Sequence, residues 1–243
     1  TFFGFEAVEQ AFTLRSGEKL VELRVEQKKE AMRLLAEFVL EPDVKQFMKK
    51  IRRGKIKKDD WQLRLEIPTF TEPRSHLEVP LTMATLEKSI APDMEKRGQV
   101  KLLYEVGWYA EKSFYTDEQM QFQWVLGTNG VVPMTLGKNH GDQSQELNKF
   151  ADRVGLNFEQ SQSRSTPLET LYRSFVMLRV PGRRILENTY DWSAVNSSDG
   201  FFVDVGRCGA SGAVVAGWPP EMAFYDLGVS FSRRSGQSRS LDS

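Results

Sequence analysis

A glycine-rich stretch around residue 206 has the residue types and spacing that could bind an anion. Residues 201–206, Phe-Phe-Val-Asp-Val-Gly, have the pattern of a buried strand, and Gly209 and Gly212 follow within a few positions. Glycines after a strand can present backbone N–H groups at a helix N-terminus, where they hold a phosphate or a carboxylate. The alternative is a buried strand followed by a flexible turn, because a short glycine motif is weak evidence without its structural context.

Three segments of the C-terminal region carry a resemblance to a known family. They are Ile-Leu-Glu-Asn-Thr-Tyr-Asp-Trp-Ser at 185–193, Val-Asp-Val-Gly at 203–206 and Phe-Tyr-Asp-Leu at 224–227. Together they resemble the start of the cofactor domain in class I S-adenosylmethionine-dependent O-methyltransferases, especially the fungal type. In that family the first strand ends in an acidic residue and a glycine-rich loop beneath the cofactor.

The resemblance implies a set of cofactor-binding residues. By position they are Asp204, Gly206, Gly209 and Asp226, the last of which would contact the ribose. Arg207 and Cys208 stand where the family usually has small residues. We expect no cofactor for this chain, or S-adenosylmethionine if the resemblance holds.

Two other templates do not fit the same stretch. Residues 209–213, Gly-Ala-Ser-Gly-Ala, are one residue short of a nucleophile elbow, and no histidine follows His140 to serve as its base. The stretch also lacks the Gly-Lys-Ser/Thr ending of a P-loop. The sequence therefore supports neither a serine hydrolase nor a P-loop nucleotide phosphatase.

A run of basic residues lies between positions 49 and 58. It has seven basic residues and no acidic one in ten positions: Lys49, Lys50, Arg52, Arg53, Lys55, Lys57 and Lys58. Such a run could bind the phosphates of RNA or an anionic surface. Asp59 and Asp60 follow at once, and no aromatic residues are interleaved to stack on bases. The alternative is a solvated helix end and turn.

The chain has two histidines, His76 and His140. His140 and Asp142 form a His-Gly-Asp triplet, a pattern that binds iron when a second histidine follows it. Here the second histidine precedes the triplet. We expect both histidines in surface turns and no metal site.

Aromatic residues recur along the central third of the chain. They could line the concave face of a sheet and bind an apolar ligand, or they could form plain core. The set is Trp61, Tyr104, Trp108, Phe122 and Trp124.

Apolar spacing of three and four predicts a helix over 18–40. Pro42 ends it, and Asp43 is expected to cap a second short helix that carries Phe47 and Ile51. Alternation then predicts a strand over 61–67 with one buried and one solvated face.

Similar alternation predicts further strands over 100–106 and 120–126. Asn129-Gly130 predicts a tight hairpin after the second of them. Residues 60–137 should thus form an antiparallel meander or curved sheet, interrupted by a helix over 83–97 that Pro92 bends or ends early.

The helical period returns over 147–154 and is closed by Gly155. Residues 159–165 are polar and predict an exposed loop or linker, and Thr166-Pro167 predicts the start of another helix. The stretch 230–243 is rich in Ser and Arg, so we expect it to be disordered.

Composition narrows the class of protein. Lys and Arg total 33 and Asp and Glu total 33, so no net field attracts nucleic acid or an anionic membrane, and any such partner needs a local patch. A single cysteine excludes an intrachain disulfide framework and favours a reducing, intracellular compartment. The sequence shows no membrane span or signal peptide. Because the chain begins at Thr1, we expect a processed form or a piece of a longer protein.

These observations predict an α+β protein in which N-terminal helices pack on a mainly antiparallel sheet, followed by a helical and strand-containing C-terminal third. The expected regions are 1–58 (helical), 59–141 (sheet), 142–232 (α/β) and 233–243 (disordered tail). The leading functional hypothesis is a soluble, non-enzymatic binding or assembly module for a protein or a small apolar ligand, with nucleic acid or an anionic surface as a further possibility at 49–58. The alternative is an incomplete or degenerate S-adenosylmethionine-dependent O-methyltransferase.

Overall fold

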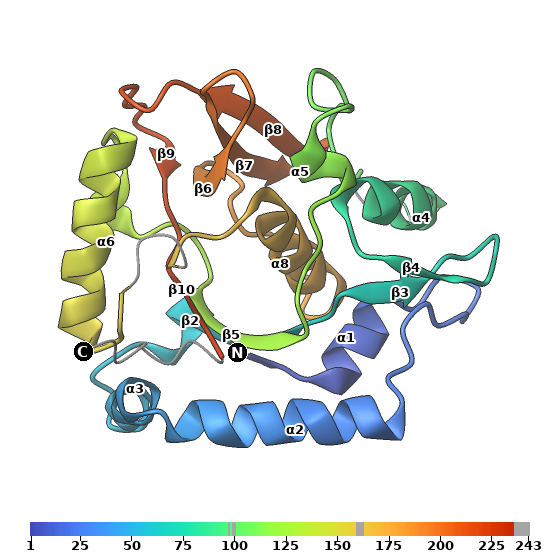
Figure 1. Ribbon diagram of the computed structural model, residues 1–243, viewed down its shortest axis with the longest axis horizontal. Coiled ribbons are helices and arrows are strands. Elements are labelled where there is room, and N and C mark those ends of the chain that lie inside the picture. The colour runs from blue at the N-terminus through green and yellow to red at the C-terminus, as the bar shows by residue number, and fades with distance from the viewer. Residues whose placement is uncertain (97, 99–100, 159–162, 236–243) are drawn as a thin grey trace.

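A computed structural model describes residues 1–96, 98, 101–158 and 163–235. They form two four-stranded sheets with one helix between them, and a two-stranded sheet of β3 (Thr69–Thr71) and β4 (Glu78–Pro80) (Figure 1). The α-helices are α1 (Phe5–Ala11), α2 (Val25–Leu40), α3 (Pro42–Arg52), α4 (Met83–Lys96), α5 (Ser113–Thr116), α6 (His140–Val154) and α8 (Pro167–Arg179). The strands are β1 (Phe2–Phe3), β2 (Trp61–Glu66), β3 (Thr69–Thr71), β4 (Glu78–Pro80), β5 (Gln123–Thr128), β6 (Tyr190–Asn196), β7 (Phe202–Gly209), β8 (Gly212–Trp218), β9 (Leu227–Gly228) and β10 (Ser232–Arg234). No helix in these described ranges is long and apolar enough to cross a lipid bilayer.

The first sheet has the strand order β1-β2-β5-β10 and joins residues that are far apart in the sequence. β5 pairs antiparallel with β2 on one side and with β10 on the other, whereas β1 runs parallel to β2. The edge strands therefore come from residues 2–3 and 232–234. The expected meander within 60–137 is wrong, because β2 and β5 pair with each other but their other neighbours, β1 and β10, come from outside that region.

Both faces of β2 are buried, so the expected solvated face is also wrong. Gln62, Arg64 and Glu66 are at most 1% exposed. They lie on the face that α8 covers, and the hydroxyl of Tyr172 on α8 donates to the carbonyl of Leu65 at 2.9 Å. The alternation of apolar and polar residues predicted that this face would contact water. In the structure, α8 covers it instead.

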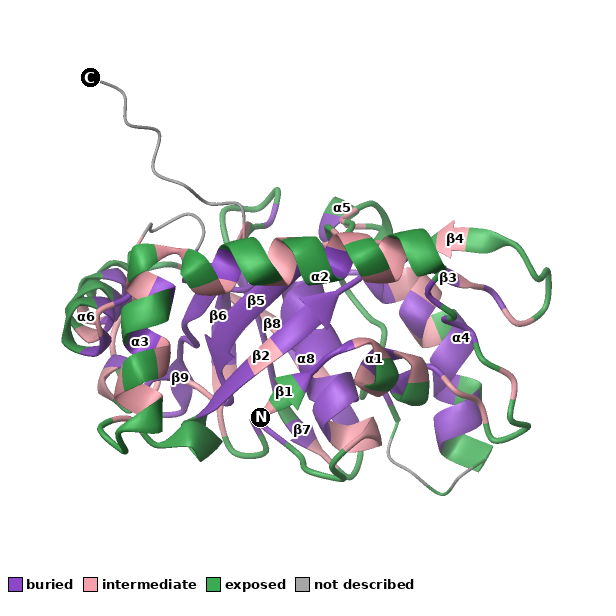
Figure 2. Cartoon of the chain, turned by 90° about the horizontal axis from the view of Figure 1, so that it is seen from below, coloured by how far each residue is buried: buried purple, intermediate pink, exposed green. Residues whose placement is uncertain are grey.

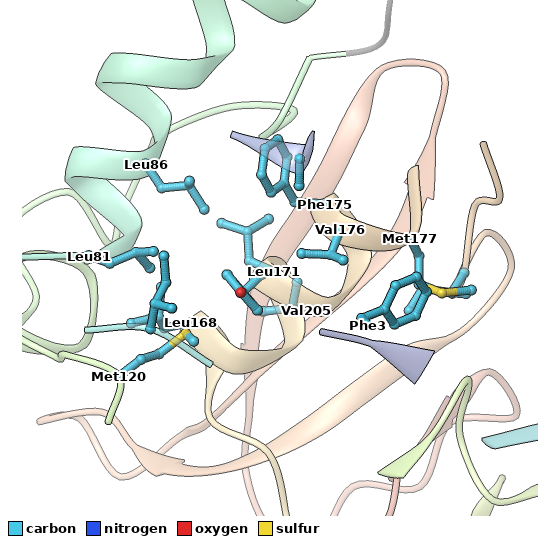
Figure 3. Packing of buried hydrophobic residues seen from close by; sticks show 14 of the residues in the cluster. Phe3, Leu81, Leu86, Met120, Leu168, Leu171, Phe175, Val176, Met177 and Val205 are labelled. Carbon is cyan, nitrogen blue, oxygen red and sulfur yellow. The ribbon is translucent and has the colours of Figure 1, made fainter. Parts of the chain in front are cut away.

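The helix α8 starts with a complete capping box. The Thr166 hydroxyl accepts the Glu169 N–H, the Glu169 carboxylate accepts the Thr166 N–H, and Pro167 occupies the first turn. This start agrees with the prediction. Its first eleven residues, through Met177, are all buried, as expected for a helix between two sheets. Figure 3 shows Leu171 and Phe175 of this helix in the core that it shares with β7 and α4.

The second sheet has the order β8-β7-β6-β9 and lies on the opposite side of α8 (Figure 1). β7 pairs antiparallel with both β6 and β8, and β9 runs parallel to β6. Val203 and Val205 of β7 belong to the core around α8. This buried strand was predicted from the sequence.

Two helices cover the outer face of the first sheet. On α2, the carbonyl of Ala31 accepts the indole N–H of Trp124 at 2.7 Å. On α3, Phe47 meets the ring of Trp61 edge-on, with 4.5 Å between ring centroids. Figure 2 shows this face with α2 across it, exposed on its outer side, above the buried strands.

The α+β class is confirmed, and several elements agree with the prediction. The helix expected over 83–97 is α4, which continues to Lys96 with Pro92 inside it. The helix that Gly155 closes is α6, and Gly155 has a left-handed φ of 79°. The break at Pro42 is also present, but Pro42 lies in the first turn of α3 and Asp43 does not cap it. The Asp43 carboxylate instead accepts the backbone N–H of Asn157.

One predicted helix starts late, and two other local predictions are wrong because distant segments supply the hydrogen bonds. The helix predicted over 18–40 is present as α2 but begins only at Val25, since the backbone of Leu20 bonds to Phe12 and Thr71. Within the predicted strand 100–106, residues 101–106 form only one isolated bridge, from Leu103 to Ala213.

No hairpin forms at Asn129-Gly130. Asn129 bonds back to the carbonyls of Asp59 and Asp60, and Val132 donates to the carbonyl of Val229. Residues 128–132 therefore join separate parts of the protein rather than two adjacent strands.

The expected exposed loop and disordered tail are wrong where the structure describes them. Ser163, Arg164 and Ser165 are at most 2% exposed. Arg233 and Arg234, at the start of the expected tail, are buried in β10. Both segments find partners within the core, and residues 159–162 and 236–243 lie outside the described residues.

Candidate functional site

The residues assigned to a cofactor by resemblance lie in or beside the second sheet. Gly206 permits close contact between strands, because a Cβ there would lie 2.2 Å from the carbonyl oxygen of Thr189. Gly209 pairs with Gly212 where the chain turns from β7 into β8. This turn leads into an antiparallel strand and not into a helix, so it presents no helix N-terminus to an anion.

The two acidic residues of that set have different environments. Asp204 is fully buried in the middle of β7, and neither carboxylate oxygen has a hydrogen-bond partner in the described structure. Burial, with Asp191 and Asp226 nearby, raises the pKa of Asp204 well above its ordinary value, so the group is held as a neutral acid. Asp226 is paired with Arg207 at 2.9 Å.

This geometry does not gather the four residues around one cavity. Arg207 has a φ of 44° and extends over the ring of Tyr190, in the region where a cofactor loop was expected. The methyltransferase resemblance remains a prediction, and calorimetry with S-adenosylmethionine would test it. A ligand-induced rise in melting temperature that Asp226→Ala removes would support it.

The single cysteine, Cys208, is not activated. Burial raises the pKa of its thiol to about 11, and its Sγ lies 3.7 Å from the hydroxyl of Ser174. At neutral pH the thiol is therefore protonated and a poor nucleophile.

The histidines are not brought together. His76 lies in an exposed turn 3.6 Å from Glu18. His140 starts α6 and stacks on Phe202 with ring centroids 3.9 Å apart, so its expected place in a surface turn is wrong. Burial lowers the pKa of His140 to about 4. The described ranges hold no group of three His, Cys, Asp or Glu side chains that could bind a metal ion.

The aromatic residues do not share one concave face. Trp61 and Trp124 are core residues, whereas Tyr104 and Trp108 are 54% and 46% exposed. An apolar site formed by this whole set is therefore wrong.

Sequence reasoning missed a buried ionic cluster between the first sheet and α8. Arg64 Nη2 lies 2.7 Å from Glu66 Oε1, and Gln123 donates to the other Glu66 oxygen at 2.9 Å. Arg234 of β10 makes two hydrogen bonds to Glu169 of α8. We call these five residues the buried ionic cluster. Its sequence signal, Gln-Leu-Arg-Leu-Glu over 62–66, is the same as that of a solvated strand face.

The pKa values of the two carboxylates in this cluster shift in opposite directions. For Glu66, burial outweighs the nearby Arg64 and raises the pKa. For Glu169, burial acts in the same direction, but the two bonds from Arg234 and the N–H of Thr166 together lower the pKa. The cluster thus links β10 to α8, and its role is to stabilise the fold.

The seven basic residues at 49–58, which we call the basic cluster, lie on the last turn of α3 and the turn after it. The Lys50 ammonium donates to the carbonyl of Val154 at 2.8 Å and so caps α6. The other six side chains are exposed.

Beside α3, a groove of about 410 Å³ runs along the first sheet. Most of its lining is apolar, and Lys58 of the basic cluster is part of it. The lining residues are Thr1, Phe2, Met48, Ile51, Lys58, Asp59, Trp61, Gln62, Leu63 and Leu126. We call it the α3 groove. It combines an apolar floor with positive charge at its border.

Comparisons with models of protein families, with characterised proteins and with solved structures find no match to this chain.

Proposed function

We propose that this protein is a non-enzymatic binding module whose α3 groove takes an acidic protein segment with apolar side chains. One observation carries the proposal: an apolar groove is bordered by the basic cluster, of whose seven cations only Lys50 has a hydrogen-bond partner in the described structure.

The apolar half of the argument rests on exposed side chains. Phe2 is 56% exposed, although it stacks on Trp124 with 5.3 Å between ring centroids. Met48 and Ile51 are one turn apart on α3, and both are only partly buried. An apolar groove rimmed by polar residues is typical of a surface that binds another molecule.

The charged half rests on the basic cluster. The chain has no net charge, so attraction of an acidic partner depends on this local patch. Lys58 lines the groove itself. Arg52 and Lys55 follow the lining residue Ile51 by one and four positions in the sequence. Complementary charge of this kind speeds association and fixes the orientation of the partner.

A protein segment fits these features better than a nucleic acid does. Bases need aromatic side chains exposed among the cations, and the basic cluster has none. The acidic Asp59 also lines the groove and would repel a continuous chain of phosphates. A peptide can instead place an apolar side chain in the groove and its carboxylates beyond Asp59.

The test uses a fluorescent synthetic peptide in which leucines recur at three- and four-residue spacing with glutamates between them. Fluorescence anisotropy should show binding at low salt that weakens as salt rises. Phe2→Ser and the quadruple change of Arg52, Arg53, Lys55 and Lys57 to Gln should each weaken binding about tenfold. The matched control is Lys19→Gln with Lys29→Gln, exposed lysines outside the groove.

Two outcomes contradict the proposal. Binding of heparin or RNA without binding of the peptide would assign the basic cluster to a polyanion. No binding of any probe at low salt would leave the cluster as a solvated helix end.

A further inference from the structure

A second cleft lies at the other end of the molecule from α3. It is bounded by α4, the loop after α1 and the loop that joins β3 to β4, which lie together on the right of Figure 1. Its volume is about 490 Å³, within the range of sites for small molecules. We call it the α4 cleft.

Four cationic side chains line the α4 cleft. Two come from loops, Arg15 and Arg74, and two from α4, Lys88 and Lys96. Lys88 and Lys96 are eight residues apart, two turns of helix, and so lie on one stripe of α4. Arg15 is held in place because its Nη1 donates to the carbonyl of Lys96 at 2.5 Å.

The carboxylates of the cleft, Glu72 and Asp93, neutralise these four cations only in part. Asp93 accepts the backbone N–H of Arg15 at 2.6 Å and pairs with the buried Arg179 at 3.2 Å, outside the lining. Glu72 accepts the backbone N–H of Ser75, and its bonds to Ser75 lower its pKa, so it stays ionised. In the described part of the chain, the Arg74, Lys88 and Lys96 side chains have no hydrogen-bond or ion-pair partner. An anion in the cleft would meet excess positive charge.

A residue that lines the same cleft carries a buried hydroxyl without a partner in the described structure. Ser89 is 7% exposed and lines the cleft, and within the described ranges its Oγ has no hydrogen-bond partner. A buried hydroxyl without a partner is costly, which is why such groups are uncommon in folded proteins. A bound anion would accept this hydrogen bond.

From these contacts we infer that the α4 cleft binds a small, multiply charged anion of the phosphate-ester class. Several positive charges from separate elements, together with one hydroxyl donor, suit the many acceptor oxygens of a phosphate group. The site is separate from the α3 groove, and it does not depend on the function proposed for that groove.

Isothermal titration calorimetry of the whole chain with inorganic pyrophosphate tests the inference. We expect binding at low salt that is about tenfold weaker in Lys88→Gln and in Ser89→Ala. Glu72→Gln keeps an acceptor for Ser75 and removes a negative charge, so it should strengthen binding. Lys57→Gln, in the basic cluster, is the matched control and should bind as the parent does.

Citrate, titrated in the same way, separates phosphate from carboxylate as the preferred anion. Tighter binding of citrate would overturn the phosphate assignment. No heat at millimolar pyrophosphate, or equal affinity in the parent and in Lys88→Gln and Ser89→Ala with unchanged melting temperatures, would overturn the site itself.

Discussion

The buried ionic cluster and the basic cluster use the same kinds of charged side chain in opposite ways. In the first, Arg64 and Arg234 each face a carboxylate, and all the members are at most 9% exposed. In the second, seven basic side chains have one hydrogen-bonded member within the described residues, Lys50. Charges that are matched inside the fold hold it together, whereas charges left unmatched at the surface are available to a partner. The predictions below test this contrast.

The largest effect should come from breaking a buried pair. Glu169→Ala leaves Arg234 buried without its carboxylate and removes half of the capping box of α8. Loss of one partner of a buried pair costs about 3–5 kcal/mol of unfolding free energy. Urea denaturation measures this, with Glu30→Ala, an exposed pair with Arg33, as the control that should change little. Similar urea midpoints for Glu169→Ala and Glu30→Ala would show that the buried pair contributes no more to stability than the exposed one.

A smaller effect should appear in the pH dependence of stability. Glu118, half-buried near Glu169 and Arg234, has a pKa raised by burial from 4.5 to about 7. The folded state therefore holds this proton more tightly than the unfolded state, so Glu118 stabilises the protein below pH 4.5 and that contribution is lost as pH rises to 7.

Glu118→Gln isolates this contribution. Between pH 5 and 8 the variant should lose about 1 kcal/mol less unfolding free energy than the parent, an amount reduced for its partial exposure. Chemical denaturation across this range provides the measurement. Parallel curves for the two proteins would show that Glu118 ionises normally.

Within the basic cluster, Lys50 should be the member that matters for stability. Lys50→Gln removes a cation from the C-terminus of α6, where it complements the helix dipole, and should cost about 0.5 kcal/mol. Thermal unfolding can compare it with Lys49→Gln, its exposed neighbour. An equal loss in both variants would mean that the contact with Val154 contributes nothing specific.

The smallest expected effect on stability is that of neutralising the free cations. Changing Arg52, Arg53, Lys55 and Lys57 together to Gln should alter unfolding free energy by no more than about 0.5 kcal/mol. The same change should flatten the salt dependence of any binding at the α3 groove, because fewer charges are screened. A large loss of stability would show that these residues belong to the fold.

The sequence predicted elements that local chemistry determines. Thr166-Pro167 marks the start of α8 wherever that helix packs, and Gly155 ends α6 because the helix closes in a left-handed conformation. Both positions were identified correctly. The α+β class followed from such local signals together with the change of hydrophobic period.

The remainder depended on partners that local patterns do not reveal. Because these residues are polar, the sequence predicted a solvated strand face at Arg64 and Glu66, an exposed loop at 163–165 and a disordered tail at Arg233 and Arg234. All of them are buried. Several of them are buried because a polar or charged group meets them from a distant segment, as Ser165 meets Ser232 at 3.1 Å and Arg234 meets Glu169 at 3.0 Å. The α4 cleft was missed for the same reason, since Arg15, Arg74 and Ser89 converge from three separate elements.

The strand order of the first sheet also sets when this protein can complete its fold. β5 must wait for β10, since Phe231 bonds to Thr128 across 103 residues of chain, and pairing over such distances is slow. During synthesis β5 follows β2 and can pair with it while the edge that β10 covers is still open, and Glu169 of α8 lacks its arginine until β10 follows. Until residue 234 has left the ribosome, the nascent chain therefore carries an unpaired strand edge and an unmatched carboxylate, the interval in which it would most need a chaperone.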